Sequence, residues 1–458
     1  MVEFYVYDLA FLVLFTLGVV WFLYKRRRNL KREGIMYLYR TKVGIKAIDY
    51  IGDKFSGFLH KLKYVVIAMG FVLMGGMIYL LWNVVYTYVK FPQITEVIKA
   101  PPIAPVIPYF PKLFGLESFF PPFYFTYFLV ALAIVAVVHE FSHGIFMRLF
   151  KIKIKSTGFV FLGPILGAFV EEDKGQMEKK SIIGQMSVLG AGTFANVVTG
   201  LVFFAIFVLF FTASYAPAGY VFNTYSLSLI PSDSVTGIED FGNLTMITSN
   251  GQTFLLDEDL KFQLDNNASE LLVYDDAPAI RNNLEGVIVQ VDEFDINNHD
   301  DLANALGEKI PGDTIRVSTK IDDEIKEYDI ILDEHPLIEG KPFLGVGNIP
   351  PQENTIVQKV LVKFMSFKDS TTHYEPNWDG NFVIFVYNFL WWIMVINFLV
   401  ALFNMLPLGI LDGGRFFYLT ILSLTKSEKF AKLSFKFVTA LILLVFFVLM
   451  LFWFIRIF

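Results

Sequence analysis

Long apolar stretches alternate with charged loops along the chain, and six of the stretches are long enough to cross a lipid bilayer as helices. They lie at Phe4–Tyr24, Tyr64–Val89, Phe123–Phe150, Ile182–Phe211, Phe382–Leu402 and Phe437–Phe454. From about Ser214 to Trp378 the composition is instead that of a soluble domain. The pattern predicts a multi-pass α-helical membrane protein with six transmembrane helices and one soluble α/β insertion.

Two shorter segments break the helical pattern. Phe91–Phe123 is rich in proline and cannot form a regular helix, so we expect an interfacial connector or a border of the path by which a substrate arrives. Ile152–Val170 has short apolar runs divided by Gly163 and Pro164, which predicts strands and a turn. The strand edge there is either part of a passive hairpin or a surface to which an extended substrate adds as a further strand.

The same pattern divides the chain into three parts. Residues 1–213 hold the first four helices and the predicted hairpin, residues 214–378 form the insertion, and residues 379–458 hold the last two helices. Both metal-binding motifs described below fall in the helical parts.

Within the insertion, about Leu271–Leu344 resembles a PDZ domain of the kind found in proteases. The resemblance is carried by alternating strands at Gly286–Val291 and Pro311–Val317 and by a helix around Asp300–Leu306. PDZ domains bind extended peptides or chain ends in a groove between strand and helix. The resemblance therefore implies that peptides or trimmed substrate ends bind here.

Composition agrees with a membrane protein and narrows its chemistry. Of 458 residues, 55% are hydrophobic and 18% charged, and none is cysteine, so disulfides and Cys-ligated zinc are excluded. The net charge of −6 indicates no nucleic-acid partner. The basic run Lys25–Arg28 follows the first apolar stretch, which predicts a cytoplasmic loop there, with both termini and the insertion outside the cytoplasm.

The third apolar stretch contains His139, Glu140 and His143. Positions four apart lie on one face of a helix, so the two histidines can ligate one metal ion, and Glu140 beside them can act as a general base. Such a short motif also arises by chance, but these side chains are costly inside a bilayer unless they bind something or face water. At about 1.5 Å per residue, His139 lies about 24 Å into a hydrocarbon core about 30 Å thick, in the cytoplasmic half.

Two further polar residues lie in apolar surroundings. Asp412 follows Pro407, which breaks the helix at about the depth of the histidines, and this predicts a third metal ligand. Alternatively, Asp412 caps the next helix. Asn196, inside the fourth stretch, either bonds to a neighbouring helix or donates to the oxyanion of a tetrahedral intermediate.

These motifs and their order resemble the site-2 protease family of intramembrane zinc metalloproteases, in its archaeal and eukaryotic branch. They are the His139–His143, Gly167–Glu171, Gly192–Asn196 and Asn404–Gly413 segments. The resemblance implies one Zn²⁺ ion held by His139, His143 and Asp412, a water activated by Glu140, and substrate or intermediate binding by Asn196. It also implies that the substrates are transmembrane proteins, often cleaved after a first cut outside the membrane.

Two alternatives come from other functional classes. A zinc-binding membrane transporter would also place His and Asp along an ion path, but it does not account for Glu140 beside the ligands. A catalytically silent scaffold built on the PDZ-like domain predicts a degraded metal motif, whereas all three ligands and the base are present.

Overall fold

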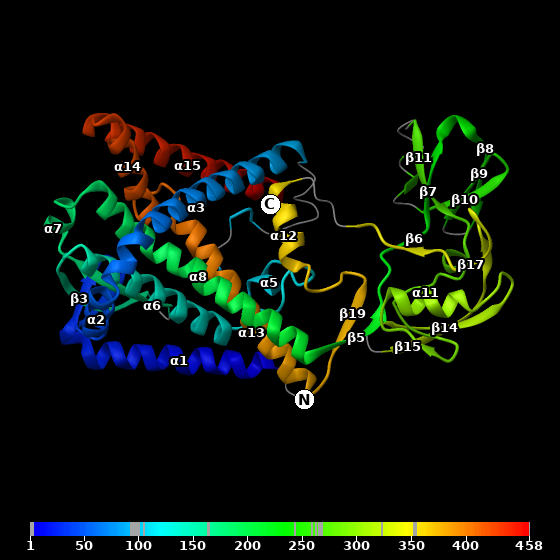
Figure 1. Ribbon diagram of the computed structural model, residues 1–458, viewed down its shortest axis with the longest axis horizontal. Coiled ribbons are helices and arrows are strands. Elements are labelled where there is room, and N and C mark those ends of the chain that lie inside the picture. Colours follow the sequence, from blue (N-terminus) through cyan, green and yellow to red (C-terminus); the bar gives the residue numbers. More distant parts are fainter. Residues whose placement is uncertain are drawn as a thin grey trace. The chain divides into compact units, whose positions relative to one another are not determined.

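The computed structural model describes residues 4–91, 101–103, 106–162, 165–241, 244–257, 260, 261, 263, 269–321, 324–350 and 355–457. Parts of the Pro-rich segment, and the predicted turn at 163–164, therefore lie outside the described residues. The chain divides into two units, one made of Met1–Phe210 with Ile384–Phe458 and the other of Phe211–Val383. The first unit is mainly helical and the second mainly stranded (Figure 1).

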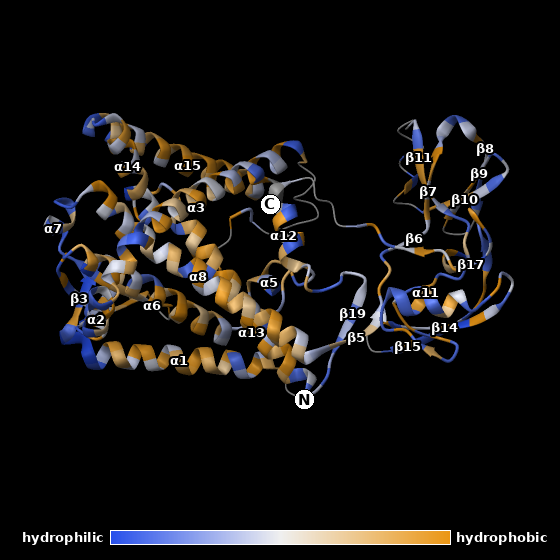
Figure 2. Ribbon diagram, in the orientation of Figure 1, coloured by the Kyte–Doolittle hydropathy of each residue, from blue (hydrophilic) through white to orange (hydrophobic). Residues whose placement is uncertain are grey.

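Six of the described helices are long and apolar enough to cross a membrane, which agrees with the prediction. They are α1 (Phe4–Arg26), α3 (Ser56–Lys90), α6 (Phe125–Leu149), α8 (Ile182–Ser214), α13 (Gly380–Asn404) and α15 (Glu428–Ile457). Apolar residues dominate all six (Figure 2), and outward-facing side chains such as Leu14, Val72 and Phe447 are 64–67% exposed. Contact with lipid accounts for this apolar outer surface.

The shorter helices of the first unit connect the long ones. They are η1 (Arg27–Asn29), α2 (Ile45–Lys54), α5 (Phe110–Leu113), α7 (Lys174–Glu178) and α14 (Asp412–Thr425). α2 buries Ile48 against Gly144 of α6, where the nearest Ile48 atom is only 2.7 Å from the position a Cβ would take. Glycine at this position therefore allows α2 to pack closely on α6.

A four-stranded antiparallel sheet packs against α6 through β4. Its order is β1 (Leu30–Glu33), β2 (Met36–Thr41), β3 (Ile154–Leu162) and β4 (Ile165–Glu172). β3 and β4 lie where the sequence pattern predicts strands. Among the described strands, β4 pairs only with β3, so its other edge is open.

The N-terminal end of α6 is held by a residue from α1. Asp8, only 1% exposed, accepts hydrogen bonds from the amide nitrogens of Phe125 at 2.6 Å and Thr126 at 3.0 Å. Its Oδ2 also accepts one from the Tyr109 hydroxyl at 2.6 Å. Since Tyr124, the N-cap residue of α6, makes no side-chain cap, Asp8 satisfies these amides from another helix.

The second unit contains two main antiparallel sheets, one ordered β7-β11-β10-β9-β8 and the other β15-β14-β12-β5-β19, with β13 beside β12. Its strands are β5 (Tyr215–Tyr220), β6 (Thr224–Tyr225), β7 (Leu227–Pro231), β8 (Val235–Phe241), β9 (Leu244–Ser249), β10 (Gln252–Leu256), β11 (Glu270–Asp275), β12 (Val287–Val291), β13 (Phe294–Asp295), β14 (Thr314–Ile321), β15 (Glu324–Ile331), β16 (Asp333–His335), β17 (Ile338–Phe343), β18 (Val346–Gly347) and β19 (Thr372–Pro376). Its helices are η2 (Ser232–Ser234), α10 (Pro278–Arg281), α11 (His299–Gly307) and α12 (Ile356–Met365).

The sheet that contains β12 and β14, together with α11, occupies the region predicted to be PDZ-like. Its buried core includes Leu302 of α11 with Ile288 and Ile315 from the sheet. Strands β5 and β19 come from outside the predicted interval and complete this sheet, so the folded region is larger than expected. Its identity as a PDZ domain stays a prediction.

Candidate metal centre

The two histidines of α6 lie one turn apart and face each other. Their ring centroids are 4.6 Å apart with an interplanar angle of 80°, and their Nε2 atoms are 3.0 Å apart. Each residue is 7% exposed. The i, i+4 spacing on α6 therefore brings both imidazoles to one point, as the sequence predicts.

Asp412 completes the cluster from a distant part of the chain. Its Oδ2 lies 3.1 Å from His139 Nε2 and 3.3 Å from His143 Nε2. The preceding turn packs tightly, because any Cβ on Gly413 or Gly414 would collide with the backbone of residues 405–408. The N-cap of α14 is Leu411, without a side-chain cap, so the alternative that Asp412 caps this helix is wrong.

This donor set fits zinc. Two imidazoles and one carboxylate are common ligands of Zn²⁺, and tetrahedral ligands at about 2.0–2.2 Å from the ion lie about 3.4 Å from one another. The three separations here, 3.0, 3.1 and 3.3 Å, are close to that spacing. A fourth position remains for water or substrate, which is the arrangement of catalytic rather than structural zinc.

Glu140 borders a cavity next to the three candidate ligands. Its Oε2 accepts a hydrogen bond of 2.9 Å from the amide nitrogen of Val170 on β4. The cavity measures about 300 Å³, and its lining includes Glu140, His139, Asp412 and the β4 residues Gly167 and Ala168. Glu140, His139, Asp412 and the open edge of β4 therefore line the same cavity.

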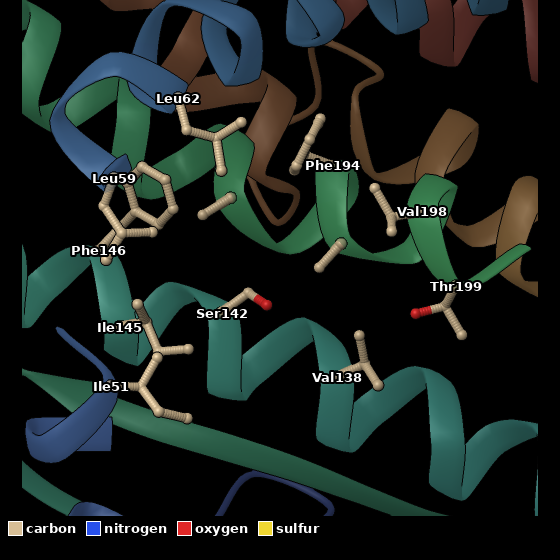
Figure 3. Close-up of a pocket in the computed structure, with 12 residues that line it drawn as sticks. Ile51, Leu59, Leu62, Val138, Ser142, Ile145, Phe146, Phe194, Val198 and Thr199 are labelled. Atoms are coloured by element: carbon tan, nitrogen blue, oxygen red, sulfur yellow. The ribbon is translucent and has the colours of Figure 1, made fainter. Parts of the chain in front are cut away.

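A second cavity, of about 280 Å³, lies between α6 and α8 (Figure 3). Its lining is apolar except for Ser142 and Thr199 and contains no titratable side chain. Acid–base chemistry needs such a group within hydrogen-bond reach. The candidate reaction centre is therefore the cavity at Glu140.

Helix α8 contacts the Nδ1 side of both histidine rings, through residues spaced by four. His143 Nδ1 lies 2.6 Å from the Val188 carbonyl oxygen, and His139 Nδ1 lies 3.1 Å from the side-chain amide of Asn196. Between them, a Cβ on Gly192 would come within 2.6–2.7 Å of the two rings. Sequence analysis named Asn196, but it missed the role of Val188, because a backbone carbonyl leaves no signal in the residue type.

Arg415 connects α14, the helix that begins at Asp412, to two neighbouring elements. Its Nη1 lies 3.3 Å from Glu172 Oε1 at the end of β4, and its Nη2 donates to Gln185 Oε1 of α8 at 3.1 Å. Three elements that border the metal centre are thereby joined through one guanidinium. Sequence analysis did not single out this residue, although it follows Asp412 by only three positions.

Glu171, beside Glu172, has a lowered pKa. The Ser156 hydroxyl, which donates to Glu171 Oε2 at 2.6 Å, is the main cause, and Arg40 at 3.1 Å adds to it. The carboxylate therefore stays ionised and links β4 to β3 and β2.

Comparison with known proteins settles the family. The sequence profile of peptidase family M50 matches residues 127–446, which include His139, Glu140, His143 and Asp412. The chain belongs to peptidase family M50. The predicted resemblance to the site-2 protease family is thus confirmed.

One relative of this M50 peptidase is an uncharacterized protein from Methanocaldococcus jannaschii. The two are 30% identical over 200 residues, which cover 42% of this chain and 49% of the relative. The chain thus spans about half the length of that relative. Members of the M50 family are zinc metalloproteases, and the His139, His143 and Asp412 cluster can hold such an ion.

Proposed function

We propose that this M50 peptidase is an intramembrane zinc endopeptidase that hydrolyses peptide bonds within the transmembrane segments of other proteins. The supporting observation is the convergence of His139, His143 and Asp412 between apolar helices, with Glu140 on the adjoining cavity. Family membership favours this function over the transporter and scaffold alternatives.

Different residues of the chain perform metal binding, proton transfer and the exclusion of water in the proposed reaction. His139, His143 and Asp412 would hold the zinc, which, when bound, supplies a Lewis acid and an activated water. Glu140 takes a proton from the attacking water and delivers it to the nitrogen of the leaving amine, so that the peptide bond breaks into a carboxylate and an amine. The apolar lining from Leu132, Val135 and Val400 limits bulk water in the cavity.

A helical substrate must unwind before it is cleaved, and the open edge of β4 offers it an extended partner. Residues two apart on a strand direct their amide hydrogens to the same side. Since the Val170 amide hydrogen points away from β3 to Glu140, those of Ala168 and Leu166 point to the same open side. We propose that an extended substrate pairs with Ala168, which lines the cavity.

We infer the orientation from the basic residues at the end of α1 and just after it. By the positive-inside rule, the run Lys25–Arg28 favours a cytoplasmic loop here, and we propose that both termini and the second unit lie outside the cytoplasm. With this orientation and the depth counted along the third apolar stretch, we propose that the metal centre lies in the cytoplasmic half of the membrane. This arrangement suits release of a cleaved cytoplasmic product.

The second unit contains a groove that suits a peptide end. A cavity of about 380 Å³ lies between α11 and the chain at residues 341–346. Its lining is apolar at Leu302, Leu306 and Phe343 and carries the cation Lys341. We propose that this groove binds an apolar chain end with a free carboxylate, such as a trimmed substrate would present.

The deciding experiment replaces Glu140 by glutamine. In liposomes with a transmembrane test substrate, cleavage by the Glu140→Gln variant is expected to fall by about 10²- to 10⁴-fold, because the proton acceptor is lost while the ligands remain. Zinc content, measured by metal analysis, should equal that of the wild type. Glu178→Gln, an exposed change outside the cavity, is the matched control. Persisting cleavage in Glu140→Gln would rule out Glu140 as the base.

A further inference from the structure

Three residues on one face of α8 meet the imidazole pair. Val188, Gly192 and Asn196 are spaced by four, so they lie on successive turns of one helix face. Gly192 leaves the space that the rings occupy, and the residues on either side of it reach one Nδ1 atom each. Each histidine therefore has one partner from α8 at its Nδ1 atom.

The partner of His143 defines where its proton lies. A carbonyl oxygen only accepts hydrogen bonds, so Val188 requires the hydrogen on His143 Nδ1. Nε2 then carries a free lone pair, and it points to Asp412 Oδ2 at 3.3 Å. This tautomer is the one that binds a metal through Nε2.

His139 needs the same tautomer, because its Nε2 also points into the cluster, 3.1 Å from Asp412 Oδ2. Its Nδ1 hydrogen then needs an acceptor, and the Asn196 amide at 3.1 Å is the group that faces it. When Asn196 directs Nδ2 to the ring, its buried Oδ1 has no hydrogen-bond partner among the described residues. A half-turn of the amide brings Oδ1 to the ring, where it can accept the Nδ1 hydrogen.

We propose that Asn196 is a positioning residue, whose Oδ1 accepts the His139 Nδ1 hydrogen and so directs Nε2 at the metal. The proposal rests on the zinc site of the proposed function. It replaces the alternative that Asn196 donates to the oxyanion. An oxyanion donor must reach the reacting oxygen in the cavity, whereas Asn196 is 0% exposed, lies behind the ring and does not line the cavity.

Two substitutions separate acceptor from donor. Asn196→Leu keeps the approximate size and removes both functions, whereas Asn196→Asp keeps only the acceptor. Loss of such an outer partner costs about 10- to 100-fold in metal affinity. We therefore expect Asn196→Leu to bind zinc about 10- to 100-fold more weakly than the wild type, and Asn196→Asp to stay within a few-fold in both zinc affinity and kcat.

The measurement is competition for zinc between the full chain in detergent and a chromophoric chelator, without substrate. Asn397→Leu and Asn397→Asp are matched controls, since Asn397 on α13 is also 0% exposed but bonds only to the Ile393 carbonyl among the described residues. These controls should bind zinc like the wild type.

Two results would overturn the positioning role. One is wild-type zinc affinity in Asn196→Leu, and the other is a loss of kcat of about 100-fold or more in Asn196→Asp with unchanged zinc affinity, which is the outcome for an oxyanion donor. If either variant does not fold, the other decides. A wild type that binds no zinc overturns the proposed function as well, so the two failures are distinguishable.

Discussion

At the scale of single residues, Glu171 has the clearest electrostatic role outside the membrane helices. The hydrogen bond from Ser156 and the charge of Arg40 favour its ionised form, which lowers its pKa. A carboxyl group whose pKa is lowered by folding stabilises the protein above its unfolded-state pKa, and this contribution is lost as the pH falls through the folded-state pKa.

We expect Ser156→Ala to raise the pKa of Glu171 toward its ordinary value and to lower the melting temperature at pH 7 by about 1–2 °C, since the carboxylate is partly exposed. Thermal unfolding in detergent between pH 7 and pH 3.5 measures this. The difference from the wild type should shrink as the pH falls and Glu171 is protonated. Ser366→Ala is the control, because the Ser366 hydroxyl donates only to a carbonyl. A difference that persists at pH 3.5 would show lost packing instead.

Residue spacing predicted that His139, His143 and Asp412 lie together, but it did not predict the residues that contact them from α8. His139 and His143 converge because any helix brings positions four apart together, and Asp412 was found from its depth after a helix break. The partner of Asn196 depends on how α8 is rotated about its axis. The sequence of a largely apolar helix does not define that rotation, because lipid and protein neighbours select the same residue types.

At the scale of elements, β4 carries the most specific prediction. Its free edge faces the cavity at Ala168, and proline is tolerated on an edge strand when its missing amide hydrogen points away from the neighbouring strand. The Ala168→Pro change therefore removes one donor to substrate and leaves the β3–β4 pairing intact.

We expect Ala168→Pro to lower kcat/KM for a transmembrane substrate by about 5- to 10-fold, the value of one hydrogen bond of about 1 kcal/mol, with unchanged zinc affinity. Cleavage kinetics in liposomes measure this. The control Ala168→Val keeps the amide hydrogen and should cleave faster than the proline variant. Equal rates for the two variants would argue against strand addition.

Prediction succeeded for elements with a strong pattern and failed for those without one. The six long helices and the pair β3 and β4 follow from apolar runs and turn residues. The strand Leu30–Glu33 carries three charges, and its pairing with β2 depends on a neighbour that is itself held by β3. The sheet β7-β11-β10-β9-β8 was likewise missed, because register across distant segments is not a local property.

At the scale of the whole molecule, the groove of the second unit allows a test of the proposed binding of a chain end. In the full chain, fluorescent peptides with an apolar last residue should bind when their carboxylate is free and at least about 5-fold more weakly when it is amidated, because Lys341 then loses its charged partner. Fluorescence anisotropy measures this. Lys341→Ala should remove the difference, and Lys359→Ala is the control, since Lys359 lies on α12 outside the groove. Equal binding of both peptide forms would exclude recognition of a chain end.

The bond between Asp8 and α6 also has a consequence for biogenesis. A ribosome makes Asp8 long before its partners, since Tyr109 lies 101 positions and Phe125 117 positions later in the chain. An unpaired carboxylate costs about 2.5–3.5 kcal/mol at the centre of a membrane helix and less near its end, where Asp8 lies, so the nascent α1 gains its full stability in the membrane only after α6 has emerged. We therefore expect α1, although synthesised before α6, to reach its final depth only after α6 is in place.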